Sequence, residues 1–348
     1  MIYIYLTFFL FLSRYFIGRF KLNLDIFYYL IFFTLFIFVS FRYEVGCDWA
    51  TYEGLFYNTD QYEWFNIFGH RDPFFWLING LLSKLNFSFL ALNIVFSGIF
   101  FLGIHKLAKF QPDPLGFLIL IFPILIVNMP MSGIRQSAAI GLICIAFIHF
   151  IEHRPIKFSM WVLIASGFHL SAIVFMALIP FSSGRYNNTR LAISIIMILP
   201  SLIFIYFSEG ASIAIKTYVG AEVEAYGAAF RVSILTLSAI YFFLCVKEKW
   251  KKTYYLDYSL VSLGSIGMVL LFLIVPFSSV ISDRFGYYLI PIQAMIFARL
   301  PFLPFKKDHY IHVILPYLGM FIVFCVWALT SWHFQKCYMP YNNWLFVR

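Results

Sequence analysis

Residues 115–151 read LGFLILIFPILIVNMPMSGIRQSAAIGLICIAFIHFI. Two apolar blocks, 115–130 and 135–151, flank a short turn around Ser132-Gly133, and Arg135 opens the second block. A helix needs roughly 20 mostly apolar residues to cross the hydrocarbon core of a bilayer. The stretch therefore predicts two adjacent membrane-spanning helices that are joined at one surface of the membrane.

The rest of the chain has the same character. Of its 348 residues, 62% are hydrophobic and 12% are charged, and the mean hydropathy is +0.85. Soluble domains carry about 25% charged residues. The composition excludes a soluble enzyme and a large domain outside the membrane. It predicts one all-α polytopic membrane domain over residues 1–348, with about ten or eleven spans.

The remaining apolar blocks predict further spans at 2–17, 25–41, 87–105, 191–208, 230–246, 256–280, 285–300 and 311–331. Residues 74–85 are apolar on one side and polar on the other, which predicts a helix lying in the membrane interface. The block at 158–181 does not fit as a simple span, and its topology follows from the positions of the basic residues.

Cytoplasmic loops of membrane proteins collect Lys and Arg. The basic clusters of this chain are Arg14/Arg19/Lys21, Lys106/Lys109, Arg154/Lys157, Arg185/Arg190, Lys247–Lys252 and Arg299/Lys306/Lys307. All six clusters can face the cytoplasm only if the segment 158–181 forms a broken, re-entrant pair of helices whose tip lies near residues 165–169. Such a break is tolerated where it lines a cavity. The net charge of +9 is then a topology signal and does not indicate nucleic acid.

This orientation puts residues 42–72 and the C-terminal tail outside, together with most polar groups. Arg135 stands at a helix start, where free backbone N–H groups and a guanidinium can hold a phosphate. Arg284 also lies at the outer edge of a predicted span. Gln136, Arg231 and Arg42 could help these two arginines to bind the phosphate. The alternative is that these arginines reach lipid headgroups or pair with nearby aspartates.

Two residues are candidates for proton transfer. His169 at the predicted tip could act as a general base or hydrogen-bond donor, although a buried core histidine is the usual alternative. Asp48 could orient or deprotonate a hydroxyl, or it could pair with Arg42. Tyr52 and Tyr341 could stack on sugars, or belong to an interfacial aromatic belt.

Other types of site are absent from the sequence. It contains no Walker loop, GxGxxG, CxxC or HExxH motif, so no nucleotide or metal site is expected. Cys47 and Cys337 both fall on the predicted outer side, where a disulfide between them is possible.

An ordered set of motifs resembles the EpsG-like, Wzy-type polysaccharide polymerases. The set consists of Arg42-x-x-Val45-Gly46-x-Asp48-x-x-x-Tyr52, Gly133-Ile-Arg135-Gln136, Ala165-Ser-x-Phe168-His169-x-Ser171-Ala172, Asp283-Arg284 and Tyr338-x-Pro340-Tyr341. The chain departs from the pattern at Arg71-Asp72, where the family often has Glu, and at Cys47 inside the first motif. Those departures put a catalytic role for the 71–72 pair in doubt.

The resemblance implies a multi-pass glycosyltransferase of the bacterial inner membrane, with its active site on the periplasmic or external face. Such enzymes build O-antigen, lipopolysaccharide or capsule chains from oligosaccharide units on undecaprenyl pyrophosphate, sometimes with a chain-length regulator protein. Asp48, His169 and Arg135 are then the expected catalytic residues. The expected substrate-binding residues are Arg135, Arg284, Arg231, Arg42, Gln136, Tyr52 and Tyr341. No metal or cofactor is expected.

Two other classes of membrane protein are alternatives. A flippase or transporter for lipid-linked sugars would be expected to have more spans and internal repeats. A glycan O-acyltransferase would be expected to have its essential His and Arg near the first span, with acyl-CoA reaching it from the cytoplasm. The outer location of the polar groups favours the polymerase.

Overall fold

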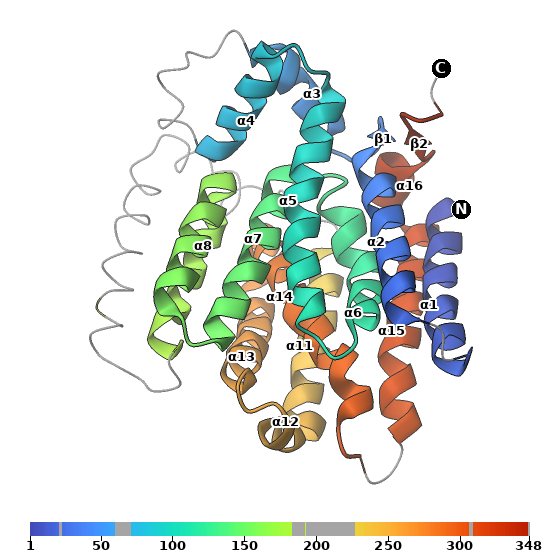
Figure 1. Ribbon diagram of the computed structural model, residues 1–348, viewed down its shortest axis with the longest axis vertical. Helices are drawn as coiled ribbons and strands as arrows, with labels where there is room; N and C mark the ends of the chain where they lie inside the picture. The colour runs from blue at the N-terminus through green and yellow to red at the C-terminus, as the bar shows by residue number, and fades with distance from the viewer. Residues whose placement is uncertain (21–22, 60–70, 183–191, 193–226, 306–308, 347–348) are drawn as a thin grey trace.

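The computed structural model describes residues 1–20, 23–59, 71–182, 192, 227–305 and 309–346. Its long helices stand side by side as an upright bundle (Figure 1). Apart from residue 192, the span predicted at 191–208 lies outside the described residues. The other predicted spans coincide with helices, to within a few residues at most ends.

The bundle contains α1 (Ile2–Phe20), α2 (Leu24–Ser40), α5 (Phe89–Lys109), α6 (Pro114–Ile121), α7 (Ile134–Ile151), α11 (Ala228–Tyr241), α13 (Tyr258–Ile274), α14 (Ser279–Arg299) and α15 (His309–Thr330). One turn of π-helix, η3 (Phe122–Ile126), extends α6, and another, η5 (Phe242–Val246), joins α11 to α12 (Lys247–Thr253). A short 3₁₀ turn, η6 (Leu300–Phe302), follows α14.

Four helical segments in the described part are long and apolar enough to cross a membrane: Phe89–Lys109, Ile134–Ile151, Ala228–Thr253 and His309–Thr330. Six further apolar helices have 10–17 residues. The predicted fold class, an all-α polytopic membrane protein, is therefore confirmed. The expected total of ten or eleven spans stays a prediction.

Helix α7 is the most enclosed of the four long segments. Its apolar window is 83% buried, whereas that of α15 is 17% buried. A close contact between glycines brings α7 against α5, because a Cβ atom added to Gly103 would lie 1.8 Å from the carbonyl oxygen of Gly141. Helix α7, which begins with Arg135 and Gln136 in its first turn, is thus packed closely against α5 inside the bundle.

The block at 158–181 forms a broken helical hairpin. Helix α8 (Pro155–Phe168) ends where His169 takes an extended conformation, and the 3₁₀ helix η4 (Leu170–Phe181) follows. The two ends meet, since His153 Nδ1 lies 2.8 Å from the carbonyl oxygen of Ser182. At 1.5 Å per residue, the break is about 20 Å from the point where the ends meet. This confirms the predicted return of the chain and the position of its tip.

Short elements form a cap over one end of the bundle, at the top of Figure 1. They are α3 (Trp49–Tyr57), α4 (Pro73–Lys84), α16 (Trp332–Tyr338) and a small antiparallel sheet that pairs β1 (Arg42–Tyr43) with β2 (Asn342–Asn343). Helix α4 is about 18 Å long, which is too short to span a 30 Å hydrocarbon core. Its placement in the membrane interface stays a prediction.

The basic clusters within the described residues gather at the end opposite the cap. Lys106 and Lys109 end α5, Arg154 precedes α8, and the lysines of α12 lie at the bottom of the bundle (Figure 1). This segregation is the arrangement that the positive-inside rule requires. Which end faces the cytosol stays a prediction.

Candidate functional site

A cavity of about 490 Å³ opens at the capped end of the bundle. Seven of the nine residues that the sequence predicts for the site line it: Asp48, Tyr52, Arg135, Gln136, His169, Arg231 and Arg284. They come from α3, α7, the break between α8 and η4, α11 and α14. The fold thus brings together side chains from widely separated parts of the chain.

Helix starts supply much of the cavity wall. Arg135 is the second residue of α7, Arg231 the fourth of α11 and Arg284 the sixth of α14. The first turn of a helix leaves backbone N–H groups without helical partners and carries the positive end of the helix dipole. Of these three helices, only α7 lines the cavity with its very start, through Gly133, Arg135 and Gln136, whereas α11 and α14 reach it with residues beyond their first three. The start of α7 and the three guanidinium groups favour an anionic ligand.

Arg135 is held in one orientation by its neighbours. Its Nη1 donates to Asp72 Oδ2 at 3.0 Å, and its Nε donates to Tyr52 Oη at 3.4 Å. The guanidinium lies over the rings of Tyr52 and Phe75, 5.6 and 5.3 Å from their centroids. The ion pair with an aspartate, which the sequence left open as an alternative, is therefore present, while Arg135 still lines the cavity.

Arg231 and Asp283 form a second ion pair. Arg231 Nε donates to Asp283 Oδ1 at 2.7 Å and Nη2 donates to Oδ2 at 2.8 Å, so the contact is bidentate. The neighbouring Arg284 lines the cavity. Gln136 Nε2 donates to the Arg284 carbonyl oxygen at 2.6 Å, which fixes the start of α7 to α14.

The two candidates for proton transfer are each anchored by a serine. Ser132 Oγ donates to Asp48 Oδ2 at 3.1 Å and so connects the first outer loop with the turn before α7. His169 Nδ1 lies 2.6 Å from Ser171 Oγ, which in turn lies 3.0 Å from Tyr288 Oη. A side chain that transfers a proton must be held within hydrogen-bond reach of the group it serves. The serine contacts restrict the orientation of the Asp48 carboxylate and the His169 ring.

The lining carries more positive than negative charge. Its four arginines (Arg71, Arg135, Arg231 and Arg284) face three carboxylates (Asp48, Asp72 and Asp283), which leaves a formal charge of 4 − 3 = +1 with His neutral. Burial raises the pKa of Asp72, and the Arg135 guanidinium opposes this shift. Burial, followed by the charge of Arg231, lowers the pKa of His333 and favours its neutral form.

Two of the predicted site residues lie outside the cavity lining. Arg42 is 1% exposed, and its guanidinium donates to the carbonyl oxygens of Val39 and Met131, both at 3.0 Å. Tyr341 Oη donates to the Phe38 carbonyl oxygen at 2.7 Å, and its ring stacks on that of Phe38. Both side chains hold the cap together and do not contact the space where a ligand would lie.

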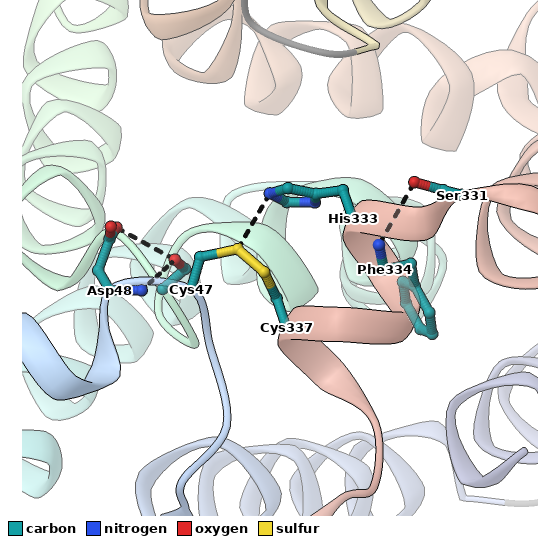
Figure 2. Close-up of a disulfide and its surroundings, with 7 residues drawn as sticks. Cys47, Asp48, Ser331, His333, Phe334 and Cys337 are labelled. Carbon is teal, nitrogen blue, oxygen red and sulfur yellow. Dashed lines mark hydrogen bonds between the residues drawn. A yellow bond between two sulfur atoms is a disulfide. The ribbon is translucent and has the colours of Figure 1, made fainter.

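A disulfide between Cys47 and Cys337 joins the loop before α3 to α16 (Figure 2). It connects residues 290 positions apart in sequence, and the Gly46 N–H adds a 2.7 Å hydrogen bond to the Cys337 carbonyl oxygen. His333 points toward the bond, with Nε2 3.1 Å from Cys47 Sγ. The cross-link thus places Asp48 and His333 on adjoining walls of the cavity.

The same three side chains, Cys47, His333 and Cys337, form the one cluster of potential metal ligands in the described part of the chain. Thiolate, not disulfide sulfur, is the ligand that metals prefer. While the disulfide is intact, the cluster is therefore a poor metal site.

Several lining residues were not predicted as members of the site. Asp72 and Asp283 were considered as partners of arginines, Asp283 and Tyr338 also belong to the motifs that resemble the family, and His333 was not assigned a role. The adjacent Asp283-Arg284 pair, and the polar character of the predicted tail, were the available signals. Asp72 could not be placed from sequence because its partner Arg135 is 63 residues away.

A model of the EpsG family matches residues 25–343 of the chain. The chain belongs to the EpsG family. The matched range includes every residue that lines the cavity, and it confirms the resemblance inferred from the ordered motifs. Membership supports a polysaccharide-polymerase type of role in general. Comparisons with curated proteins and with solved structures found no match.

Proposed function

We propose that this EpsG family member is a Wzy-type polymerase that extends a lipid-linked polysaccharide. The growing glycan would leave undecaprenyl pyrophosphate and pass to the non-reducing end of the next lipid-linked oligosaccharide. The observation that carries this proposal is the cavity at the capped end, where the start of α7 and four arginines meet three carboxylates. A diphosphate joined to a sugar matches that combination of positive charge and hydroxyl-binding groups.

The diphosphate would bind between Arg135 and Arg284. Asp72 and Tyr52 orient the Arg135 guanidinium, and the hydrogen bond from Gln136 Nε2 to the Arg284 carbonyl oxygen fixes the backbone of Arg284 against the start of α7. Guanidinium groups fixed in advance stabilise the negative charge that develops as the glycosidic C–O bond to phosphate breaks. Arg231 would contribute less, because Asp283 occupies its Nε and Nη2, whereas the contact of Arg135 with Asp72 uses Nη1 alone.

In the transfer step, the acceptor hydroxyl oxygen attacks the anomeric carbon of the donor sugar. A new glycosidic bond forms as the bond to diphosphate breaks, and the bonding electrons leave with the diphosphate. The hydroxyl proton passes to Asp48 or His169, which are the two candidate bases that line the cavity. Attack from the face opposite the leaving group would invert the anomeric centre.

Diphosphate is already a good leaving group, so the reaction requires neither a nucleotide nor a bound metal as a matter of chemistry. The arginines can supply the positive charge that a cation would otherwise provide.

The cavity would face the periplasm or the exterior of a bacterial inner membrane. Two features support this orientation: the described basic clusters lie at the opposite end of the bundle, and disulfides such as Cys47–Cys337 persist in oxidising compartments. Membrane lipids, the lipid-linked oligosaccharide and a chain-length regulator protein would be the partners.

The central experiment replaces Arg135 by alanine and measures glycan chain length in membranes at wild-type expression. Removal of one fixed donor to a developing anion lowers kcat by about 10²–10³-fold, so chains should shorten strongly. Arg154→Ala is the matched control, because Arg154 is an exposed arginine at the far end of the bundle. Chains of undiminished length in Arg135→Ala would remove Arg135 from the mechanism.

A null mutant separates the polymerase from the two alternatives. Surface lipid capped with a single repeat unit is expected for loss of a polymerase. Complete loss of surface glycan would indicate a flippase, and long chains without acetyl groups would indicate an O-acyltransferase.

A further inference from the structure

Asp72 has an unusual position for an aspartate. It precedes Pro73 at the start of α4, is 6% exposed, and has φ and ψ of 61° and 58°. This left-handed conformation is uncommon for a residue other than glycine, and a following proline normally favours extended backbone. Such a conformation persists where surrounding contacts require it, often at functional sites.

The two carboxylate oxygens of Asp72 contact two different elements. Oδ2 accepts from Arg135 Nη1 at 3.0 Å, and Oδ1 accepts from the backbone N–H of Leu170, also at 3.0 Å. Arg135 belongs to the first turn of α7, and Leu170 is the first residue after the break at His169. One carboxylate therefore connects the start of α4, the start of α7 and the tip of the re-entrant pair.

We propose that Asp72 is a positioning residue that fixes the distance between the Arg135 guanidinium and His169. The inference rests on the proposed function, because it gives Asp72 a role in the geometry of glycan transfer. Arg135 would hold the leaving diphosphate and His169 would face the acceptor, so their spacing must match the span of the reacting groups. Asp72 acts through these two residues and not on the substrate.

The chemistry of the side chain makes this role testable. A carboxylate offers an acceptor on each oxygen, whereas an asparagine amide offers one acceptor and one donor. In Asp72→Asn, either Arg135 or the Leu170 N–H must therefore face an N–H₂ group. One of the two connections is lost while the size of the side chain is kept.

The chain contains a closely matched control in Asp113. It also precedes a proline at the start of a helix, its Oδ2 accepts from Arg14, and its Oδ1 accepts from the Gly116 N–H at 2.9 Å. It is 5% exposed, and it caps the start of α6, which follows the basic end of α5 at the end of the bundle opposite the cap. Asp113→Asn should thus reproduce the structural cost of Asp72→Asn without the effect on catalysis.

The experiment measures kcat and KM of the purified full-length protein for a lipid-pyrophosphate-linked oligosaccharide, together with the unfolding midpoint of each variant. Misplacement of reacting groups by about 1 Å can lower the rate about 10²-fold. Asp72→Asn should lower kcat to about that extent with KM changed only a few-fold. Asp113→Asn should have a similar unfolding midpoint and nearly wild-type kcat. Equal kcat in the two folded variants would overturn the proposal.

Two further variants sharpen the result. Asp72→Glu keeps both acceptor oxygens and should recover part of the lost kcat; complete inactivity of a folded Asp72→Glu would contradict a positioning role. If Asp72→Asn does not fold, Asp72→Glu decides alone, and wild-type kcat would then contradict the proposal, because the longer side chain must displace Arg135 or the break.

Arg135→Ala separates this inference from the proposed function. Asp72→Asn should add little to the loss in an Arg135→Ala background, because Asp72 acts partly through Arg135. An inactive Arg135→Ala with a fully active Asp72→Asn would refute only the positioning role. Full activity in both would refute the proposed function of the cavity itself.

Discussion

Loss of one partner of the Arg231–Asp283 ion pair is expected to destabilise the protein by about 3 kcal/mol, at the lower end of the range for buried pairs. The size of this destabilisation follows from the burial and the hydrogen bonds of the ion pair. The side chains are 14% and 13% exposed, and two hydrogen bonds of 2.7 and 2.8 Å join them. Asp283→Asn would leave the guanidinium without its counter-charge at a site that is mostly buried but borders the cavity, which is why the lower end of the range applies.

Two other ion pairs in the chain provide a graded comparison. Arg299 and Asp257 are 3% and 4% exposed, and Trp250 and Gln111 also bond to them. Asp257→Asn should therefore cost more, about 4–5 kcal/mol. Lys109 and Asp25 are 35% and 71% exposed, so Asp25→Asn should cost less than about 1 kcal/mol.

The assay is the apparent free energy of unfolding of each variant, from SDS titration in mixed micelles. The expected order of destabilisation is Asp257→Asn, then Asp283→Asn, then Asp25→Asn. In addition, Arg231→Gln combined with Asp283→Asn should cost less than the sum of the single changes, since no charge is then left unpaired. Equal costs at the three sites, or additivity at Arg231–Asp283, would refute the argument from burial.

Two further predictions concern packing and the cross-link. Gly103→Ala should destabilise the protein by about 1–3 kcal/mol or more, because its Cβ would overlap the Gly141 carbonyl. Gly98→Ala on the same helix is the control: its Cβ meets nothing within 4 Å, so it should be neutral or slightly stabilising. The midpoints of SDS unfolding of the two variants test this, and a tolerated Gly103→Ala would be inconsistent with the close contact between the helices. Replacement of both Cys47 and Cys337 by serine should cost about 2–5 kcal/mol. In protein whose free cysteines Cys144, Cys245 and Cys325 are replaced by serine, neither Cys47 nor Cys337 should react with a maleimide before reduction, and rapid labelling of that unreduced protein would show that the disulfide is not formed.

Much of the fold follows from local sequence. The apolar blocks predicted nearly all of the described long helices, and the break at His169 followed from a conflict between hydropathy and basic loops. Both signals depend on neighbouring residues and on the membrane as a solvent, so they can be recognised without knowledge of tertiary contacts. Seven predicted site residues also proved to line the cavity, since the sequence indicated that their helix ends lie at the same end of the bundle and the packing of the helices brings those ends together.

The partners of those residues could not be predicted in the same way. Arg42 and Tyr341 belong to motifs similar to those of the site, yet the fold turns both toward backbone carbonyls beneath the cap. The sequence did not place Asp72 among the site residues, yet it contacts both Arg135 and the break between α8 and η4.

The sequence by itself therefore determined which segments form the long apolar helices, and it indicated that most polar groups gather at one end of the bundle. Only the tertiary structure decided which arginine meets which carboxylate, and which side chains reach the cavity. The physical reason is the distance along the chain between the residues that interact. Hydropathy and helix starts are local properties, whereas the Arg231–Asp283 and Arg135–Asp72 ion pairs join residues 52 and 63 positions apart, and the disulfide joins residues 290 positions apart. Such contacts exist only once the helices have packed.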